Sequence, residues 1–276
     1  MWFDRRAWRL RTRSQVVGLV GMSLCLSSCA YVRYTLQRPS THLKLQAEDG
    51  TWVACDLYDK GRRRVIVVSP GFLQQKRSPG IWELSQVLQP DFDVIALDYR
   101  GTGESSGWYA YTAREAYDLH TVLQFANRRW AQVGVVGVSL GAAVAINELA
   151  RHPEEARGLA TISAPMAFDA IEKQVSPTLT TIALSEASWG MRSGNPFLPK
   201  TDPLTEISHL TVPILLIHGG ADTVVYPRHS RQLYDHTQGP RALLIIPRAG
   251  HAHELILEYL PDCAAALTQW FDQTLR

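Results

Sequence analysis

Six short apolar runs constrain the fold of this chain more than any other feature of its sequence. Each run is rich in Val, Ile and Leu, is nearly continuous rather than alternating, and ends in Gly, Ser or Pro. The runs are RVIVVSPG, FDVIALDYRG, QVGVVGVS, GLATISAP, VPILLIHGG and RALLIIPRAG. Continuous apolar runs are typical of strands buried on both faces of a sheet. We therefore predict an α/β fold built on a mostly parallel sheet.

Helical patterns fill most of the intervals between these runs. We expect helices over residues 81–88, 113–129, 140–151, 228–236 and 254–275. Because strand and helix alternate along most of the chain, the crossovers should place helices on both faces of the sheet.

Two shorter stretches precede the first apolar run. THLKLQ and TWVACDLY alternate apolar and polar residues and are separated by Glu48, Asp49 and Gly50. Alternating strands around a tight turn are typical of a β-hairpin, so we predict an N-terminal antiparallel hairpin.

The chain has 276 residues, of which 46% are apolar and 20% charged, enough to bury a sizeable core without disulfides. Its formal charge of +2 is concentrated at the N-terminus, where residues 1–28 hold five arginines against a single acidic residue. The rest is slightly acidic and offers no broad basic surface for phosphates. We therefore expect no nucleic-acid partner.

Residues 1–28 have the order of an export signal: an Arg-rich start, an apolar run at 16–26, then small residues. A helix over that run would cross only about half of a ~30 Å hydrocarbon core, so a permanent span is not expected. Leu26-Ser27-Ser28-Cys29 resembles a bacterial lipobox, in which the Cys is lipidated and becomes the first residue. The alternative is an ordinary signal peptide that happens to end near a Cys.

This interpretation predicts a lipoprotein signal peptide at 1–28, a tether at 29–40 and one folded domain at 41–276. Acyl chains, palmitate among them, on Cys29 would anchor the body outside the cytoplasm in a bacterial envelope. Ala30, rather than Asp, after the Cys favours the outer membrane by the sorting tendency of such lipoproteins.

Two cysteines, Cys55 and Cys263, lie in the predicted domain. An oxidising compartment permits a disulfide between them, but buried free thiols are the favoured interpretation. No pair of cysteines has the spacing of a zinc site, and we expect no metal site.

A long interval without a strand pattern lies between the fourth and fifth runs, at about 165–210. Loops of this length inside a domain are usually lids or disordered segments, so we predict a short cap insertion. Aromatic candidates for lining a pocket beneath it, which would hold an acyl group if the chemistry proves to be acyl transfer, are Trp108, Tyr109, Tyr111, Phe168 and Trp189.

Gly137-Val138-Ser139-Leu140-Gly141 lies between the third run and a predicted helix. A strand-to-helix turn this tight holds the Ser139 hydroxyl exposed on strained backbone, and only small residues fit on either side. The motif predicts a nucleophile. The alternative is a small-residue turn that merely packs a helix against the sheet.

A serine hydroxyl needs a base, and His251 in IPRAGHAHE directly follows Gly250 at the end of the last run. His253 is the competing histidine. An acid must orient the imidazole, and Asp222 in LLIHGGADTVV follows the preceding run, at the same edge of the sheet. Asp202 and Asp169 are weaker alternatives.

The developing oxyanion needs preorganised donors, each worth roughly 3 to 4 kcal/mol. The backbone N–H of Leu140, first in its helix, is one candidate. The turn after the first run should supply the second. Because Pro70 has no N–H and Gly71 only lets the chain bend, Phe72 is the favoured donor.

The motifs SPGF, LDYRGTGESSG, GVSLG, HGGADTVV and AGHAHE, in this order, resemble the α/β-hydrolase superfamily, in particular its serine-aminopeptidase and monoacylglycerol-lipase-like branch. The resemblance runs from about Leu43 to the C-terminus. It implies Ser139 as nucleophile, Asp222 as acid and His251 as base. Phe72 and Leu140 would form the oxyanion hole.

The resemblance also assigns residues 98–105 to a loop in which Asp98 and Arg100 brace their neighbours. The chain departs from the family pattern in having Pro70 before Gly71, where His is usual, and Val138 before the nucleophile. Neither change removes a catalytic atom, but both weaken any transfer of substrate specificity.

We therefore predict a membrane-anchored serine hydrolase that cleaves carboxylic esters, of the esterase, lysophospholipase or monoacylglycerol-lipase kind. Its partners would be a small-molecule or lipid ester and a membrane, with no metal or organic cofactor. An amidase or peptidase and an acyltransferase are alternatives on the same triad. A non-catalytic envelope lipoprotein is the alternative from another class.

Overall fold

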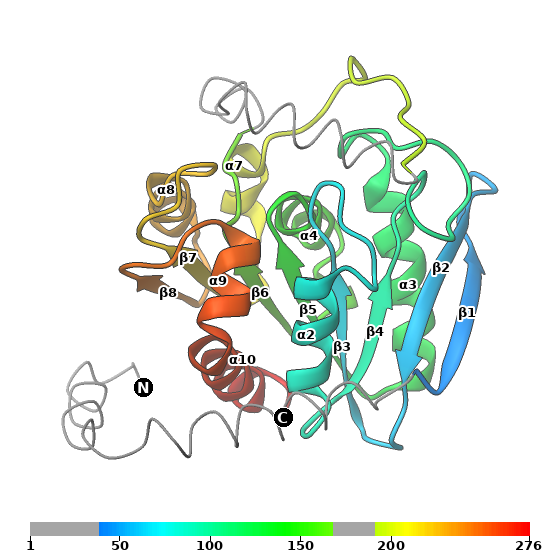
Figure 1. The fold of residues 1–276 in the computed structure, drawn as a ribbon, viewed down its shortest axis with the longest axis horizontal. Helices are drawn as coiled ribbons and strands as arrows, with labels where there is room; N and C mark the ends of the chain where they lie inside the picture. Colours follow the sequence, from blue (N-terminus) through cyan, green and yellow to red (C-terminus); the bar gives the residue numbers. More distant parts are fainter. Residues whose placement is uncertain (1–38, 168–190) are drawn as a thin grey trace. The chain divides into compact units, whose positions relative to one another are not determined.

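In the part of the chain that the structure describes, eight strands form one sheet, in the order β1-β2-β4-β3-β5-β6-β7-β8 (Figure 1). This computed structural model describes residues 39–167 and 191–276. The predicted signal peptide, most of the tether and part of the predicted cap lie outside them. The strands are β1 (Thr41–Gln46), β2 (Trp52–Tyr58), β3 (Arg64–Ser69), β4 (Asp93–Leu97), β5 (Gln132–Val138), β6 (Gly158–Ile162), β7 (Ile214–Gly219) and β8 (Arg241–Ile246).

The predicted mostly parallel sheet is confirmed. Strands β4, β3, β5, β6, β7 and β8 pair in parallel, and they are the six continuous apolar runs. Strands β1 and β2 form the predicted antiparallel hairpin, and β2 joins it to β4. Gly50 turns the hairpin with a φ of 84°, a conformation that glycine adopts without steric cost.

Helices cover both faces of the sheet and bury two separate cores. The cores contain residues of α3, α4 and α8 on one face and of α2, α9 and α10 on the other. The α-helices are α2 (Pro79–Leu88), α3 (Glu115–Arg129), α4 (Leu140–Arg151), α7 (Pro203–Glu206), α8 (Arg228–His236), α9 (Ala252–Glu258) and α10 (Leu260–Thr274); η1 (Pro153–Glu155) and η2 (Ile207–His209) are short 3-10 helices.

The C-terminal helix differs from its prediction. We expected one helix over 254–275, whereas the structure has two, α9 and α10, which meet at Tyr259. Pro261 explains the break. It cannot donate a hydrogen bond to the preceding turn and is favoured in the first turn of a helix, where it lies in α10.

The predicted cap is described only at its ends. Residues 168–190, with Asp169, Phe168 and Trp189, lie outside the described residues. After them, the backbone of Arg192 exchanges hydrogen bonds with Gly101 and Tyr109, and the Gly194 N–H donates to the Tyr109 carbonyl at 2.9 Å. The end of the insertion is thus fastened to the loop after β4.

Cys55 and Cys263 are both free and buried, as favoured from the sequence. They belong to the cores on opposite faces of the sheet, which explains why they do not pair. Within the described ranges, none of the helices combines the length and hydropathy needed to cross a bilayer.

Candidate active site

Ser139 lies on a strained turn between β5 and α4. Its φ of 50° and ψ of −115° are rarely adopted by a residue with a side chain. The Ser139 N–H donates to the Ile162 carbonyl at 2.8 Å, which fixes the turn to β6. A methyl group at Gly137 would lie 2.5 Å from the Ala142 Cα, and one at Gly141 would lie 2.3 Å from the Pro70 oxygen. Both positions therefore require glycine.

Three residues that the sequence placed at the same sheet edge form one chain of contacts. Ser139 Oγ lies 3.0 Å from His251 Nε2, and His251 Nδ1 lies 2.7 Å from Asp222 Oδ2. His251 is the residue before α9, and Asp222 follows β7. The structure thus brings the predicted nucleophile, base and acid within hydrogen-bonding distance of one another.

Asp222 is buried and has more donors than the histidine alone. Its Oδ1 accepts the N–H groups of Val224 and Val225 at 2.9 and 2.8 Å. His218 Nε2 approaches its Oδ2 at 3.2 Å. Burial would raise the pKa of Asp222, but the hydrogen bonds from His218 and His251 outweigh it and hold the pKa well below its usual range. The carboxylate therefore stays charged beside the imidazole.

Backbone contacts hold the Asp222 and His251 loops together. The Gly220 N–H donates to the Ile246 carbonyl at 2.7 Å, and the Ala221 N–H donates to the Ala249 carbonyl at 2.9 Å. A methyl group at Gly219 would lie 2.1 Å from the Gly250 oxygen, so no larger residue fits there. The two loops therefore hold Asp222 and His251 in a fixed position relative to each other.

The competing candidates lie elsewhere or are not described. A methyl group at Gly80 would lie 3.3 Å from His253 Nδ1, so the His253 ring packs against α2. Asp202 precedes the short helix α7. His251 contacts Ser139, and Asp222 contacts His251.

The turn after β3 lies against the nucleophile. A methyl group at Gly71 would lie 3.3 Å from the Ser139 Cβ. The Gly71 N–H donates to Gln74 Oε1 at 2.8 Å, so it is already used. Among the described residues, no acceptor pairs with the backbone N–H of Phe72 or of Leu140. These two predicted donors remain available beside Ser139.

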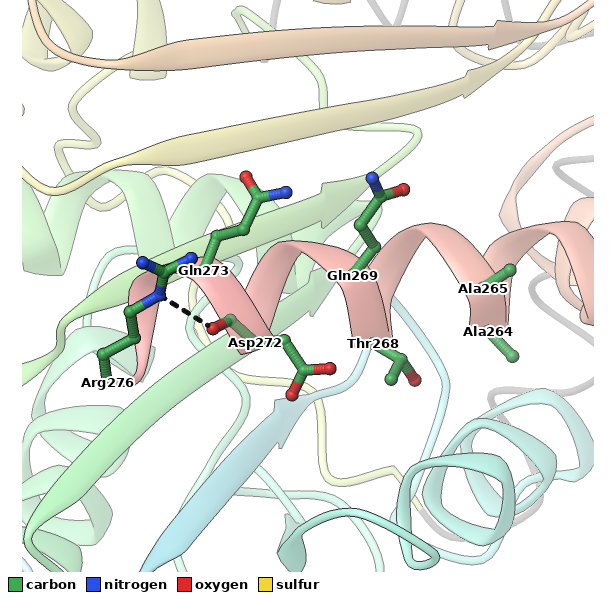
Figure 2. A pocket seen from close by; sticks show the side chains of 7 residues that line it. All are labelled: Ala264, Ala265, Thr268, Gln269, Asp272, Gln273 and Arg276. Atoms are coloured by element: carbon green, nitrogen blue, oxygen red, sulfur yellow. Dashed lines mark hydrogen bonds between the residues drawn. The ribbon is translucent and has the colours of Figure 1, made fainter. Parts of the chain in front are cut away.

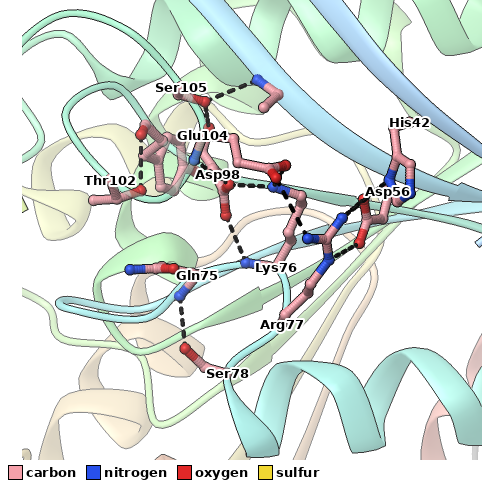
Figure 3. Close-up of polar contacts among 12 residues, drawn as sticks. His42, Asp56, Gln75, Lys76, Arg77, Ser78, Asp98, Thr102, Glu104 and Ser105 are labelled. Carbon is pink, nitrogen blue, oxygen red and sulfur yellow. Dashed lines mark hydrogen bonds and ion pairs between the residues drawn. The ribbon is translucent and has the colours of Figure 1, made fainter. Parts of the chain in front are cut away.

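A cluster of ion pairs fixes the far end of this turn (Figure 3). Lys76 is buried and its ammonium contacts both Asp98 and Glu104, while the Lys76 backbone N–H donates to Asp98 Oδ1 at 2.8 Å. Arg77 binds both oxygens of Asp56 on β2, at 2.7 and 2.9 Å. The turn is therefore held between β2 and the loop after β4.

Asp98 and Arg100 brace loops rather than contact Ser139. Asp98 Oδ2 also accepts the Glu104 N–H at 2.9 Å. Arg100 pairs with Asp118 at 2.7 Å and with Asp49 at 2.6 Å. Both residues thus connect the loop after β4 to neighbouring elements.

Three aromatic rings gather beside the turn. The Phe72 ring centroid lies 5.8 Å from that of Tyr109 and 5.9 Å from that of Tyr111, and the two tyrosine rings are 5.2 Å apart. Trp108, the other described candidate for an acyl pocket, is largely exposed. An apolar wall therefore lies next to the candidate oxyanion donors.

Sequence reasoning missed three supporting residues. His218 contacts Asp222, and Lys76 anchors the turn after β3. Ser163, with a φ of 54°, accepts the Ala252 N–H at 3.1 Å and so fixes the start of α9. His218 lies in the quoted HGGADTVV motif, and its spacing of four residues from Asp222 was the available signal.

A hollow on the outer side of α10 is a weaker candidate (Figure 2). Residues of α10 and Arg276, which follows the helix, supply the whole lining: Ala264, Ala265, Thr268, Gln269, Asp272, Gln273 and Arg276. These side chains include no nucleophile with a base, and Asp272 already pairs with Arg64 at 2.7 Å. The hollow has none of the chemistry present at Ser139.

We predict that Lys76→Met lowers the free energy of unfolding by about 3 to 5 kcal/mol, because it leaves the buried Asp98 carboxylate without its counter-charge. Urea denaturation measures the change. The exposed Lys60, changed to Met, is the matched control and should shift stability by no more than about 0.5 kcal/mol. Equal effects of the two variants would contradict this account of the turn.

We predict that His229 contributes a loss of stability in mild acid. Burial, with the charges of Arg228 and His218, lowers the pKa of His229 to about 4 from an ordinary 6.5, and its Nδ1 accepts the Met166 N–H at 3.1 Å. Between these pH values the unfolded chain binds the proton and the folded chain does not, so stability falls as pH falls.

The contribution of His229 to the change in the free energy of unfolding should be at most about 1.4 kcal/mol per pH unit. Urea denaturation from pH 7.5 to pH 4.5 measures it, and His229→Gln should flatten the curve. The exposed His236, changed to Gln, should leave the wild-type slope. A His229→Gln curve parallel to that of the wild type would refute the assignment.

Two family models and a curated bacterial protein match parts of this chain. A family model described as the α/β-hydrolase fold matches residues 64–182, and one described as serine aminopeptidase S33 matches residues 201–259. YfhR of Escherichia coli (strain K12), an uncharacterized protein, is 28% identical over 176 residues. That match covers 62% of this chain and 57% of YfhR, so the chain spans little more than half of this relative.

Solved structures share the fold at low sequence identity. The Pyrococcus furiosus esterase Pf2001 is 18% identical, with a TM-score of 0.74 over 95% of this chain and 97% of its own. A structure described as a membrane phospholipase A, a bacterial virulence factor, is 19% identical, with a TM-score of 0.67 over 93% and 98%. The chain has the α/β-hydrolase fold that these structures share, and the matched family models support a hydrolase.

Proposed function

We propose that the protein is a serine hydrolase that cleaves carboxylic esters through an acyl-serine intermediate. The observation that carries the proposal is the contact chain from Ser139 through His251 to Asp222, at 3.0 and 2.7 Å. Nucleophile, base and orienting acid in this arrangement are what acyl transfer by serine requires. Two of the proteins that share the fold are described as an esterase and a phospholipase, which are ester hydrolases, and this supports the proposal.

In the proposed reaction, His251 Nε2 takes the proton of Ser139 as Oγ attacks the ester carbonyl. Asp222 keeps the imidazole oriented and stabilises its charged form without taking the proton. The Phe72 and Leu140 N–H groups would bind the oxyanion. The imidazolium then protonates the leaving alcohol, which departs and leaves the acyl group on Ser139.

Water completes the cycle. His251 takes a proton from a water molecule as its oxygen attacks the acyl-serine, and the second tetrahedral intermediate collapses to release the carboxylic acid and return the proton to Ser139. Esters have better leaving groups than amides, which is why we favour them over the amidase or peptidase alternative. An acyltransferase would use an alcohol in place of water.

The aromatic wall of Phe72, Tyr109 and Tyr111 supports an apolar acyl group as the part of the substrate bound at Ser139. Aromatic side chains offer a large apolar surface, and Phe72 carries one of the proposed oxyanion donors on its own backbone. We therefore propose esters of carboxylic acids with apolar chains, lipid esters included.

Fluorophosphonate labelling tests the enzyme proposal. The wild type should label, and Ser139→Ala should not, because the probe reacts only with an activated serine. Hydrolysis of p-nitrophenyl esters should fall by about 10⁴-fold or more in both Ser139→Ala and His251→Ala. His253→Ala is the matched control, since its ring packs against α2, and it should keep near wild-type rates.

Two results would contradict the proposal. The first is a wild-type protein that the probe does not label under conditions that label a control hydrolase. That result would favour the non-catalytic alternative, in which the fold serves as a binding module. Loss of turnover in His253→Ala but not in His251→Ala would overturn the assignment of the base. Aminoacyl amides and an added alcohol acceptor, run beside the esters, distinguish the amidase and the acyltransferase.

We also propose that Cys29 carries a lipid anchor that holds the hydrolase body at an envelope membrane. The support is the sequence Leu26-Ser27-Ser28-Cys29 after a short apolar run. Cys29 lies outside the described residues. In a bacterial host, Cys29→Ser should block processing and palmitate incorporation, whereas the control Cys25→Ser should leave both unchanged. A processed, membrane-bound Cys29→Ser protein would exclude the lipobox.

A further inference from the structure

A second cluster of ionisable side chains lies at the end of α4 opposite Ser139. His120 comes from α3, Glu148 from the last turn of α4, and His152 from the residue that ends this helix. Glu155 follows in the short helix η1. One potential ligand atom each from His120, Glu148 and His152 falls within 4.8 Å of the other two.

The ligand atoms converge on His120. Its Nδ1 lies 3.0 Å from Glu148 Oε1 and 2.7 Å from Glu155 Oε1. The rings of His120 and His152 are neighbours, with centroids 4.9 Å apart. The spacing of four residues places Glu148 and His152 on the same side of the helix end. Two imidazoles and two carboxylates therefore face one small volume.

Two carboxyl groups lie buried together in this volume. The side chains of Glu148 and Glu155 are only 5% and 7% exposed. Glu155 Oε2 is buried and, within the described residues, receives no hydrogen bond. The nearby Arg151 donates instead to Thr201 and Glu206, at 3.0 and 3.3 Å. A buried polar atom without a partner is costly, and a cation bound between these side chains would supply the partner that Glu155 Oε2 lacks.

We propose that His120, Glu148 and His152, with Glu155 in reach of a fourth position, bind a divalent transition metal ion of the Zn²⁺ class. Imidazole and carboxylate ligands together suit Zn²⁺, which binds them at about 2.0 to 2.2 Å in a tetrahedron. The edge of such a tetrahedron is about 3.3 Å. The two distances at His120 Nδ1 are a few tenths of an ångström shorter, so the ion would move these ligands apart only slightly.

The other nitrogen of His120 is also held. Its Nε2 lies 2.8 Å from Gln124 Nε2 in the next turn of α3. With a metal on Nδ1, Nε2 carries the proton and donates to the Gln124 amide oxygen after the amide turns over. Hydrogen bonds of this kind orient the histidine ligands of most metal sites.

Access and role follow from the positions of the ligands. The His152 side chain is 44% exposed, so an ion can enter from solvent at its side. A bound ion would cross-link α3 to the end of α4, the helix that begins directly after Ser139. The site would therefore stabilise the support of the nucleophile without touching the substrate, and it stands whether or not Ser139 hydrolyses esters.

Metal titration tests the proposal. The full-length chain, without a histidine tag and purified in detergent, is stripped with EDTA, desalted and titrated with Zn²⁺ alone. We expect one tightly bound Zn²⁺ per chain by metal analysis and a rise in the thermal midpoint of about 5 to 10 °C near saturation. Replacement by Co²⁺ should give the visible absorption of a tetrahedral nitrogen and oxygen site.

Matched variants distinguish this site from other histidines. His152→Ala and Glu148→Gln should each weaken Zn²⁺ binding at least tenfold and remove the thermal shift. His209→Ala, an exposed histidine, and His251→Ala should keep wild-type stoichiometry. If Glu148→Gln fails to fold, Zn²⁺ binding by His152→Ala is the deciding measurement, because His152 is partly exposed and its replacement should not prevent folding. Absence of Zn²⁺ above background in the wild type, or unchanged binding in His152→Ala, would overturn the proposal.

Discussion

The contact between the first turn of α4 and the end of β3 is the constraint on which the rest of the site depends. A methyl group at Gly141 would lie 2.3 Å from the Pro70 oxygen, and Ser69 Oγ donates to the Gly141 carbonyl at 2.9 Å. This approach places the turn that carries the Phe72 N–H beside Ser139. The strained backbone of Ser139 persists because packing on both sides over-determines it. Nucleophile and oxyanion donors are thus positioned by backbone atoms, whose placement is insensitive to side-chain rotation.

Buried charged side chains also stabilise the arrangement around Ser139. Lys76 is buried between Asp98 and Glu104, and Asp222 is buried among donors that keep its pKa low. Each is a buried ion that its partners hold in place. Removing one partner is therefore expected to lower the stability of the fold by more than the intact pair adds to it. The histidine therefore meets a fixed charge at Asp222, and the turn after β3 is fixed at its far end. Both contacts reduce the reorganisation that the proposed chemistry would require.

The sequence was most informative where the backbone alone determines position. Ser139, Asp222 and His251 each follow a continuous apolar run, and parallel strands bring such positions to one edge of the sheet. The contribution of Lys76 depends on where a long side chain ends in three dimensions, which no local pattern records. The break at Tyr259 was predictable from Pro261, but the apolar periodicity continues across it and concealed the boundary. His218 was within a recognised motif, yet its contact with Asp222 depends on the path of the loop after β7.

The two ends of α4 show how one helix can connect separate chemistries. Its first residue follows Ser139, and its last turn carries Glu148, beside His120 and Glu155. In the sequence, Glu148, His152 and Glu155 lie close together, whereas His120 comes from another helix, so the cluster is complete only in three dimensions. An ion there would restrain α4 at one end while the packing of Gly141 restrains it at the other. The position of the nucleophile would then depend on both restraints, so metal binding and the geometry at Ser139 would be coupled through the helix itself rather than through any shared ligand.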